Sequence, residues 1–137
     1  MAEKSYAHVP LISKLGLKPG KKMYVQGAPD NYFQILGELP EGVIVCDSLE
    51  LDMDFIHIFV KRSNQLADLL PALKRALKKD GMLWISWPKR TSRIDTNLSD
   101  TRVIDIGVMN GLVDIKVASI DSNWSALKFV YRLKDRI

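Results

Sequence analysis

The sequence predicts an α/β fold, a doubly wound and mainly parallel sheet that ends in a C-terminal antiparallel hairpin. Three observations lead to this class. Residues 54–60 and 82–87 are apolar without polar alternation, which is typical of strands covered on both faces. Segments with helical spacing of apolar residues lie between the strands, as in βαβ units. The last two strands are separated by a segment short enough for a hairpin, residues 121–124.

The first half of the chain predicts two strands around a short helix. A strand is expected at 21–27, where it ends at a glycine, and Pro29 and Asp30 then begin a helix that reaches about residue 36. The β-branched run 43–46 predicts a brief strand. Only six residues separate Asp47 from Asp54, whereas a parallel crossover needs about ten to twelve. We therefore expect the usual third strand and its helix to be missing and place strand 43–46 at a sheet edge, its orientation open.

A longer helix is expected after the strand at 54–60. Leucines recur at helical spacing from Leu66 to Leu77, and Ser63 can cap the start of this helix. Lys78 and Lys79 followed by Gly81 are typical of a helix end. Pro71 predicts a kink or a restart within the helix.

The remaining elements are predicted from strand and cap signals. A strand at 82–87 ends at Pro88, and Asn97 or Ser99 caps a helix that runs to Met109. Two strands, 113–120 and about 126–133, then form the hairpin, so the last strand runs antiparallel to its neighbour.

Composition limits the classes of function. The chain has 137 residues, 47% of them hydrophobic, and we expect a single domain over 1–137 with residues 1–17 as an N-terminal arm packed on it. One cysteine, Cys46, excludes an internal disulfide and a multi-thiolate zinc site. No apolar run approaches the roughly 18 residues of a membrane span, and residues 1–10 lack signal-peptide features. We expect a cytoplasmic protein with no membrane partner.

Charge is segregated along the chain. Residues 23–60 contain seven acids and neither Lys nor Arg, whereas residues 61–93 contain nine bases and two acids, a net charge of +7. Such runs most often form a solvated surface. The alternative is a phosphate- or nucleic-acid-binding surface. It requires four bases to converge in space, namely Lys61, Lys89, Arg90 and Arg93.

Several segments resemble known families. The runs 15–27 (LGLKPGKKMYVQG) and 69–86 (LLPALKRALKKDGMLWIS), with the strand 54–60 and the terminal hairpin, resemble Rossmann-like S-adenosylmethionine-dependent methyltransferases. Segments 54–60, 81–89, 111–116 and 124–130 are similar to a bacterial family known only as domain of unknown function 3052. The first resemblance implies an S-adenosylmethionine cofactor at the loop after the first strand. The second implies a fold without an established activity.

The cofactor loop departs from the methyltransferase pattern of acid-x-Gly-x-Gly-x-Gly. The four defined positions fall on Val25, Gly27, Pro29 and Asn31, so only one of them is kept. Glycines let bare backbone approach the cofactor and present N–H donors. Pro29 has no N–H group, and Asp30 would repel the cofactor's carboxylate. Asn31 is a tolerable replacement, because asparagine adopts the left-handed conformation more readily than most residues.

Other candidate residues have a functional and a structural interpretation. Asp47 lies 47 − 27 = 20 residues after Gly27, the interval of a ribose-binding acid, although a surface turn is the favoured role. His57 shares a strand face with Phe55 and Phe59 and is expected to be a hydrogen-bonded core histidine. Cys46 is expected to be a buried, inert thiol.

The tryptophans divide in a similar way. Trp84 is expected in the core. Trp87 and Trp124 lie at strand ends, where an indole can stack on a flat ligand, but core packing is favoured for both.

These observations favour a non-catalytic binding or regulatory module without a cofactor, on a shortened methyltransferase-like scaffold. Its partner would be a small ligand or a protein. In the first alternative, an S-adenosylmethionine-dependent methyltransferase, Gly27, Asn31 and Asp47 hold the cofactor. The second alternative is a phosphate- or nucleic-acid-binding protein. Seven residues are candidates for ligand or anion binding: Asp30, Lys61, Trp87, Lys89, Arg90, Arg93 and Trp124.

No residue is assigned a catalytic or a metal-binding role, and no nucleophile elbow or phosphate loop occurs. The short strand 43–46 and the last strand, 126–133, would allow a homodimer by edge pairing.

Overall fold

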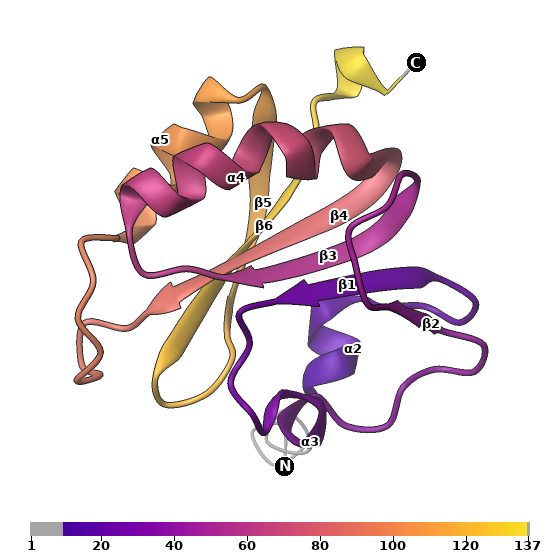
Figure 1. Ribbon diagram of the computed structural model, residues 1–137, viewed down its shortest axis with the longest axis horizontal. Coiled ribbons are helices and arrows are strands. Elements are labelled where there is room, and N and C mark those ends of the chain that lie inside the picture. Colours follow the sequence, from indigo (N-terminus) through magenta and orange to yellow (C-terminus); the bar gives the residue numbers. More distant parts are fainter. Residues whose placement is uncertain (1–9, 137) are drawn as a thin grey trace, which may run out of the picture.

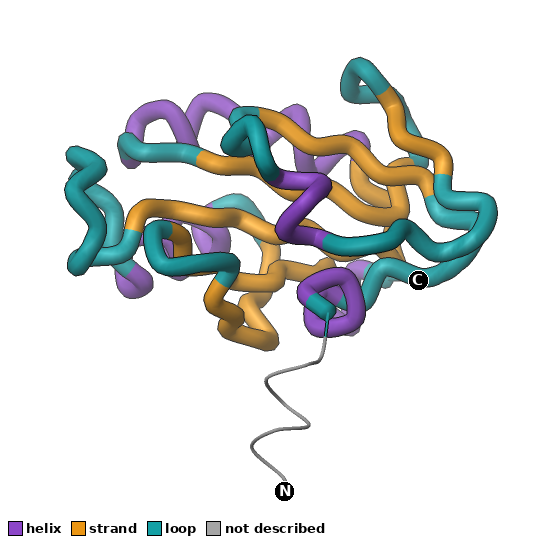
Figure 2. Tube along the Cα trace, turned by 90° about the horizontal axis from the view of Figure 1, so that it is seen from below, coloured by secondary structure: helices purple, strands orange, loops and turns teal. Residues whose placement is uncertain are grey.

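A six-stranded sheet runs through the molecule, with helices on both sides of it (Figures 1 and 2). The computed structural model describes residues 10–136, so the first nine residues of the expected N-terminal arm lie outside the described residues. The strands are β1 (Lys22–Gln26), β2 (Ile44–Cys46), β3 (Met53–Phe59), β4 (Leu77–Pro88), β5 (Leu112–Ser119) and β6 (Trp124–Tyr131). The helices are α2 (Leu11–Leu15), α3 (Tyr32–Leu36), α4 (Ser63–Ala76), α5 (Asp100–Met109) and the 3-10 turn η1 (Leu133–Asp135).

The strand order is β2-β1-β3-β4-β6-β5. The first four strands are parallel, and β6 is antiparallel to both β4 and β5. The predicted fold class is confirmed, including the C-terminal hairpin.

Strand β2 lies at the sheet edge, as predicted, and its orientation is parallel to β1. Since β2 and β3 flank β1, residues 47–52 must return across β1, and they do so on the side of α4 (Figure 1). Six residues suffice because β2 has only three residues. Leu49 packs against the core on the α4 side, and Asp52 adopts a positive φ of 62°.

Two hydrophobic clusters cover the two faces of the sheet. Helices α4 and α5 pack on one face through residues such as Leu66, Leu70 and Val103. Helices α2 and α3 pack on the other face. There the fully buried Trp84 donates a hydrogen bond from Nε1 to the carbonyl of Leu15 at 2.9 Å, as a tryptophan of the core should.

The predicted end of the long helix is wrong. Helix α4 ends at Ala76, and Leu77 already pairs with Met53 in the sheet. Gly81 is buried within β4, where an added Cβ would lie 2.9 Å from the Met53 carbonyl oxygen, so close packing between strands requires this glycine. The predicted restart is also wrong, because α4 is continuous through Pro71.

The last strand does not form a sheet edge. Strand β6 lies between β4 and β5, so the free edge on this side belongs to β5. The prediction that the last strand is available for pairing between chains is therefore wrong, because both sides of β6 are already paired.

Candidate functional site

A cavity of about 680 Å³ lies beyond the carboxyl end of β4, between the loop that follows this strand and the β5–β6 hairpin. Apolar side chains form part of its lining, from Trp87, Pro88, Ile94, Leu98 and Val117. Charged and hydroxyl groups form the rest, and they come from Lys89, Arg90, Thr91, Asp95, Thr96, Ser99, Asp100 and Ser125. The volume falls within the range of about 300–1,000 Å³ that is typical of small-molecule sites.

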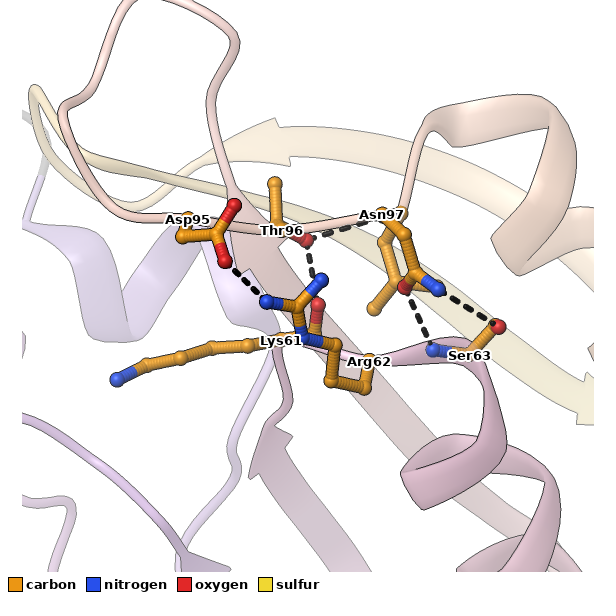
Figure 3. Close-up of polar contacts among 7 residues, drawn as sticks. Lys61, Arg62, Ser63, Asp95, Thr96 and Asn97 are labelled. Atoms are coloured by element: carbon orange, nitrogen blue, oxygen red, sulfur yellow. Dashed lines mark hydrogen bonds and ion pairs between the residues drawn. The ribbon is translucent and has the colours of Figure 1, made fainter.

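Residues 95–97 of the loop after β4 contact residues 61–63 at the start of α4 through hydrogen bonds and an ion pair (Figure 3). The carbonyl of Lys61 accepts hydrogen bonds from the Thr96 hydroxyl at 2.6 Å and from the backbone N–H of Asn97 at 3.3 Å. Arg62 forms an ion pair with Asp95. These contacts tie the residues after β3 to the residues after β4, so the cavity wall has a defined position.

Lys89 connects the same loop to the hairpin. Its backbone N–H donates to the Asn123 carbonyl at 2.8 Å, and its Nζ donates to the hydroxyl of Ser119 at 2.6 Å. The neighbouring Arg90 is exposed and also lines the cavity.

Only two of the four bases of the predicted anion surface line the cavity. Lys89 and Arg90 line one cavity, whereas Lys61 and Arg93 do not contribute to its lining. The Lys61 side chain extends away from the contacts that its carbonyl makes (Figure 3). Asp95 and Asp100 line the cavity beside the two bases, so its charge is mixed rather than cationic.

Both tryptophans at strand ends are buried, as favoured from the sequence. Trp87 is 6% exposed and still lines the cavity. Trp124 is 7% exposed and packs edge-on against Phe59, with ring centroids 5.0 Å apart. Of these two tryptophans, Trp87 is therefore the one that lines the cavity.

The turn after β1 differs in backbone geometry and packing from the glycine-rich loop that the methyltransferase resemblance implies. Gly27 has a φ of 74°, and an added Cβ would lie 2.7 Å from the carbonyl oxygen of Phe59, so this glycine serves the packing of β1 on β3. Asn31 has a φ of −93°, outside the left-handed region that a glycine would supply there. Val25, at the acid's position, packs against the core beside α2 and α3.

The other two candidates at this edge are solvent-exposed. Asp30 precedes α3, and Asp47 follows the edge strand β2. Neither residue lines the cavity after β4, and nor do Gly27 and Asn31. The structure thus separates the expected cofactor residues from the cavity.

His57 is a core histidine with both ring nitrogens hydrogen-bonded, as predicted. Nδ1 lies 2.8 Å from the Tyr32 hydroxyl and Nε2 lies 2.7 Å from the Ser86 hydroxyl. Burial lowers the pKa of His57 to about 3 and raises the pKa of Tyr32. The imidazole is therefore neutral near pH 7 and joins α3, β3 and β4.

Cys46 differs from the expected buried thiol. It is only partly buried, because it lies on the three-residue edge strand. Burial, with a contribution from Glu50, raises the pKa of its thiol, which therefore has little thiolate character at neutral pH.

Sequence reasoning missed the contacts that join the loop after β4 to the start of α4. Asp95 and Thr96 follow no motif, and Asn97 was expected only as a cap of the helix that follows it. The partners of all three residues lie more than 30 residues earlier. The density of hydroxyl, amide and carboxylate side chains in residues 91–100 was the signal that could have indicated a structured loop.

Two further findings concern the described residues. Among residues 10–136, no group of three or more His, Cys, Asp or Glu side chains is placed to hold a metal ion. Every helix in the same range is too short or too polar to cross a lipid bilayer.

Comparison with known proteins shows the fold. A SAM-dependent methyltransferase from Aquifex aeolicus is 17% identical, with 93% of this chain and 87% of that chain covered and a TM-score of 0.62. Magnesium protoporphyrin IX methyltransferase from Synechocystis PCC 6803, solved with bound SAH, is 11% identical over 95% of this chain and 81% of that chain, with a TM-score of 0.57. A possible exported protein from Bordetella parapertussis is 11% identical over 95% and 68% of the two chains, with a TM-score of 0.64.

The sequence comparisons find no relative. No family model matches the chain, and no curated protein matches it. The resemblance to domain of unknown function 3052 thus has no support from a family match. The similarity to the solved structures supports a Rossmann-like, methyltransferase-like scaffold.

Proposed function

We propose that this protein is a non-catalytic binding module that takes a small ligand in the cavity after β4. The observation that carries the proposal is this cavity of about 680 Å³, which lies at the carboxyl end of a sheet strand and has Trp87 in its lining. In doubly wound folds, ligands bind outside the carboxyl ends of the strands. The turn after β1, where the methyltransferase resemblance expects a cofactor, has its glycine in close packing instead.

The lining of the cavity indicates the chemistry of the ligand. Trp87 and Val117 offer apolar surface, whereas Arg90 and Asp100 offer opposite charges. A ligand with a flat apolar part and groups of both charges fits this combination, because an apolar lining with a few polar groups fixes both affinity and orientation. A strongly anionic ligand fits less well, because two carboxylates share the lining.

An S-adenosylmethionine-dependent methyltransferase is the second candidate. The fold comparisons favour it, because two of the similar structures are named methyltransferases and one of them contains bound SAH. In this candidate Gly27, Asn31 and Asp47 hold the cofactor and the substrate docks near Trp87 and Lys89. The cofactor would supply the methyl group.

A thermal-shift screen distinguishes the two candidates. The panel contains S-adenosylmethionine, S-adenosylhomocysteine, nucleotides and polyanions, because any ligand selective for the folded state raises the apparent stability. Two variants separate the sites. Thr91→Trp adds a large exposed side chain to the lining of the cavity, and Asp47→Asn alters the exposed acid after β2.

The binding module predicts a ligand whose stabilising effect is lost in Thr91→Trp and kept in Asp47→Asn. Stabilisation by S-adenosylmethionine that is lost in Asp47→Asn and kept in Thr91→Trp would instead establish the methyltransferase candidate. Methyl transfer to any acceptor by the wild-type protein would exclude a non-catalytic role.

A further inference from the structure

The fold divides the basic run 61–93 between two ends of the sheet. Helix α4 runs from the carboxyl end of β3 to the amino end of β4 (Figure 1). Lys61 therefore lies at the end with the cavity, whereas Lys74 and Lys79 lie at the opposite end. The second group is independent of the proposed ligand site and is joined there by the C-terminal segment.

Lys74 and Lys79 gather around the ring of Tyr131 at the end of β6. The Nζ atoms lie 5.6 Å and 4.9 Å, respectively, from the ring centroid, within the range of cation–π attraction. The Tyr131 hydroxyl donates a hydrogen bond to the carbonyl of Lys74. Lys79 Nζ also donates to the carbonyl of Asp135 at 3.1 Å.

Two arginines complete this group, which we call the Tyr131 basic cluster: Lys74, Lys79, Arg132 and Arg136. Arg132 donates from Nη2 to the Val108 carbonyl at 3.0 Å, and Arg136 donates from Nε to the Tyr131 carbonyl at 2.8 Å. The four bases thus come from α4, from β4 and from the segment after β6.

Among the residues that the structure describes, no ion pair is formed by the four bases of the cluster. The ion pairs within residues 10–136 involve Lys22, Arg62 and Lys78. Backbone carbonyls and an aromatic ring orient these bases, and neither cancels a positive charge. Burial, with a contribution from the nearby Asp135 carboxylate, raises the pKa of Tyr131.

We propose that the Tyr131 basic cluster binds the phosphate backbone of a nucleic acid strand. Bases that are already positioned lose less side-chain freedom on binding, and each phosphate contact releases a condensed counterion. None of the four bases lines the cavity after β4, and none lines either of two further hollows, one between α4 and α5 and one near Gly16. An extended polyanion therefore suits this open surface better than an enclosed small phosphate.

The contact would be independent of base sequence. Tyr131 is only 6% exposed and is covered by two lysines, so its ring is not available to stack on a base. The remaining groups of the cluster are cationic and match phosphates rather than base edges.

Fluorescence anisotropy with labelled 20-nucleotide RNA and DNA strands of two unrelated sequences tests the proposal. We expect both sequences to bind and log K to fall linearly with log[salt]. Lys79→Gln combined with Arg132→Gln should weaken binding by about one to two orders of magnitude at 0.1 M salt and lower the salt slope by about 2. The charge-retaining pair Lys79→Arg with Arg132→Lys should bind as the wild type does, which guards against a folding defect.

The matched control removes two charges at the other end of the sheet. Lys61→Gln combined with Arg93→Gln should leave the affinity within about twofold of the wild type. Equal loss in the two charge-removing variants would overturn the proposal, because net charge alone would then explain binding. Absence of binding at 50 mM salt would also overturn it, as would retention on vesicles of anionic lipid without nucleic-acid binding.

Discussion

Asn97 and Ser63 exchange two hydrogen bonds across 34 residues of sequence. The backbone N–H of Ser63 donates to Oδ1 of Asn97 at 2.9 Å, and Nδ2 of Asn97 donates to the Ser63 hydroxyl at 3.2 Å. Residue 62, the N-cap position of α4, makes no capping bond with its own side chain. The loop that lines the cavity therefore supplies the cap of α4, which couples the helix to the candidate site.

Asn97→Ala should lower the free energy of unfolding by about 1 kcal/mol, because the first turn of α4 loses its cap. Equilibrium denaturation in urea measures this change. Asn97→Asp is the matched control, since it keeps the acceptor for the Ser63 N–H and places a negative charge at the helix start. A loss in the aspartate variant as large as in the alanine variant would show that the capping bond is not the source of the stability.

The role of Asn97 also shows what sequence reasoning can reach. Local spacing assigned Asn97 or Ser99 to the helix that follows, and Ser99 does cap α5 by accepting a hydrogen bond from the Arg102 N–H. The partner of Asn97 belongs to an earlier helix and is set by tertiary packing. The helix end predicted from Lys78, Lys79 and Gly81 was wrong for a similar reason. Pairing of Leu77 with Met53 in the sheet competes with the local helix signal.

Elements with a strong local signal were predicted well. The doubly covered strands, the hairpin and the edge position of β2 follow from apolar pattern and connection length. The hydrogen-bonded state of His57 was also predicted, but its partners Tyr32 and Ser86 were not. Partners of a buried group depend on strand register, which a single sequence does not specify.

The stability of the protein should depend on pH through His57. Burial lowers the pKa of His57 from 6.5 to about 3, so between these values the unfolded chain binds a proton that the folded chain does not. The free energy of unfolding should therefore fall as the pH decreases below about 6.5. Above that pH His57 is neutral in both the folded and the unfolded chain, so its burial carries no protonation penalty there. Urea denaturation at pH 7, 6 and 5 measures the slope, since most carboxylates stay ionised in this range.

Two variants assign this pH dependence to its residue. His57→Gln should flatten the slope between pH 7 and 5, although it also lowers the overall stability. His8→Gln is the control, because it removes the other histidine of the sequence, and this variant should retain the slope. A slope that survives in His57→Gln would contradict a neutral, buried imidazole.

Gly107 in α5 allows the helix to contact the ring of Phe129. An added Cβ would lie 2.2 Å from an atom of this ring, so Gly107→Ala should destabilise the protein. Three ring atoms lie closer than 3.0 Å to the added Cβ, so the overpacking cost should fall in the upper part of the usual range of about 1–3 kcal/mol. It then exceeds the gain of about 1 kcal/mol from replacing a helical glycine. In a double-mutant cycle, Phe129→Leu should reduce the cost of Gly107→Ala, and additive effects would contradict the contact.

Gly27, in the turn after β1, can be compared with Gly20, in the turn before β1. Their φ values are 74° and 75°, but an added Cβ at Gly27 meets the Phe59 carbonyl oxygen at 2.7 Å, whereas at Gly20 nothing lies within 4 Å. Gly20→Ala should therefore cost about 1 kcal/mol from backbone strain alone. Gly27→Ala should cost about 1–3 kcal/mol more, because a strand backbone cannot move aside as a side chain can. Denaturant midpoints of the two variants give the difference, and equal losses would show that Gly27 is kept for a reason other than packing of β1 on β3.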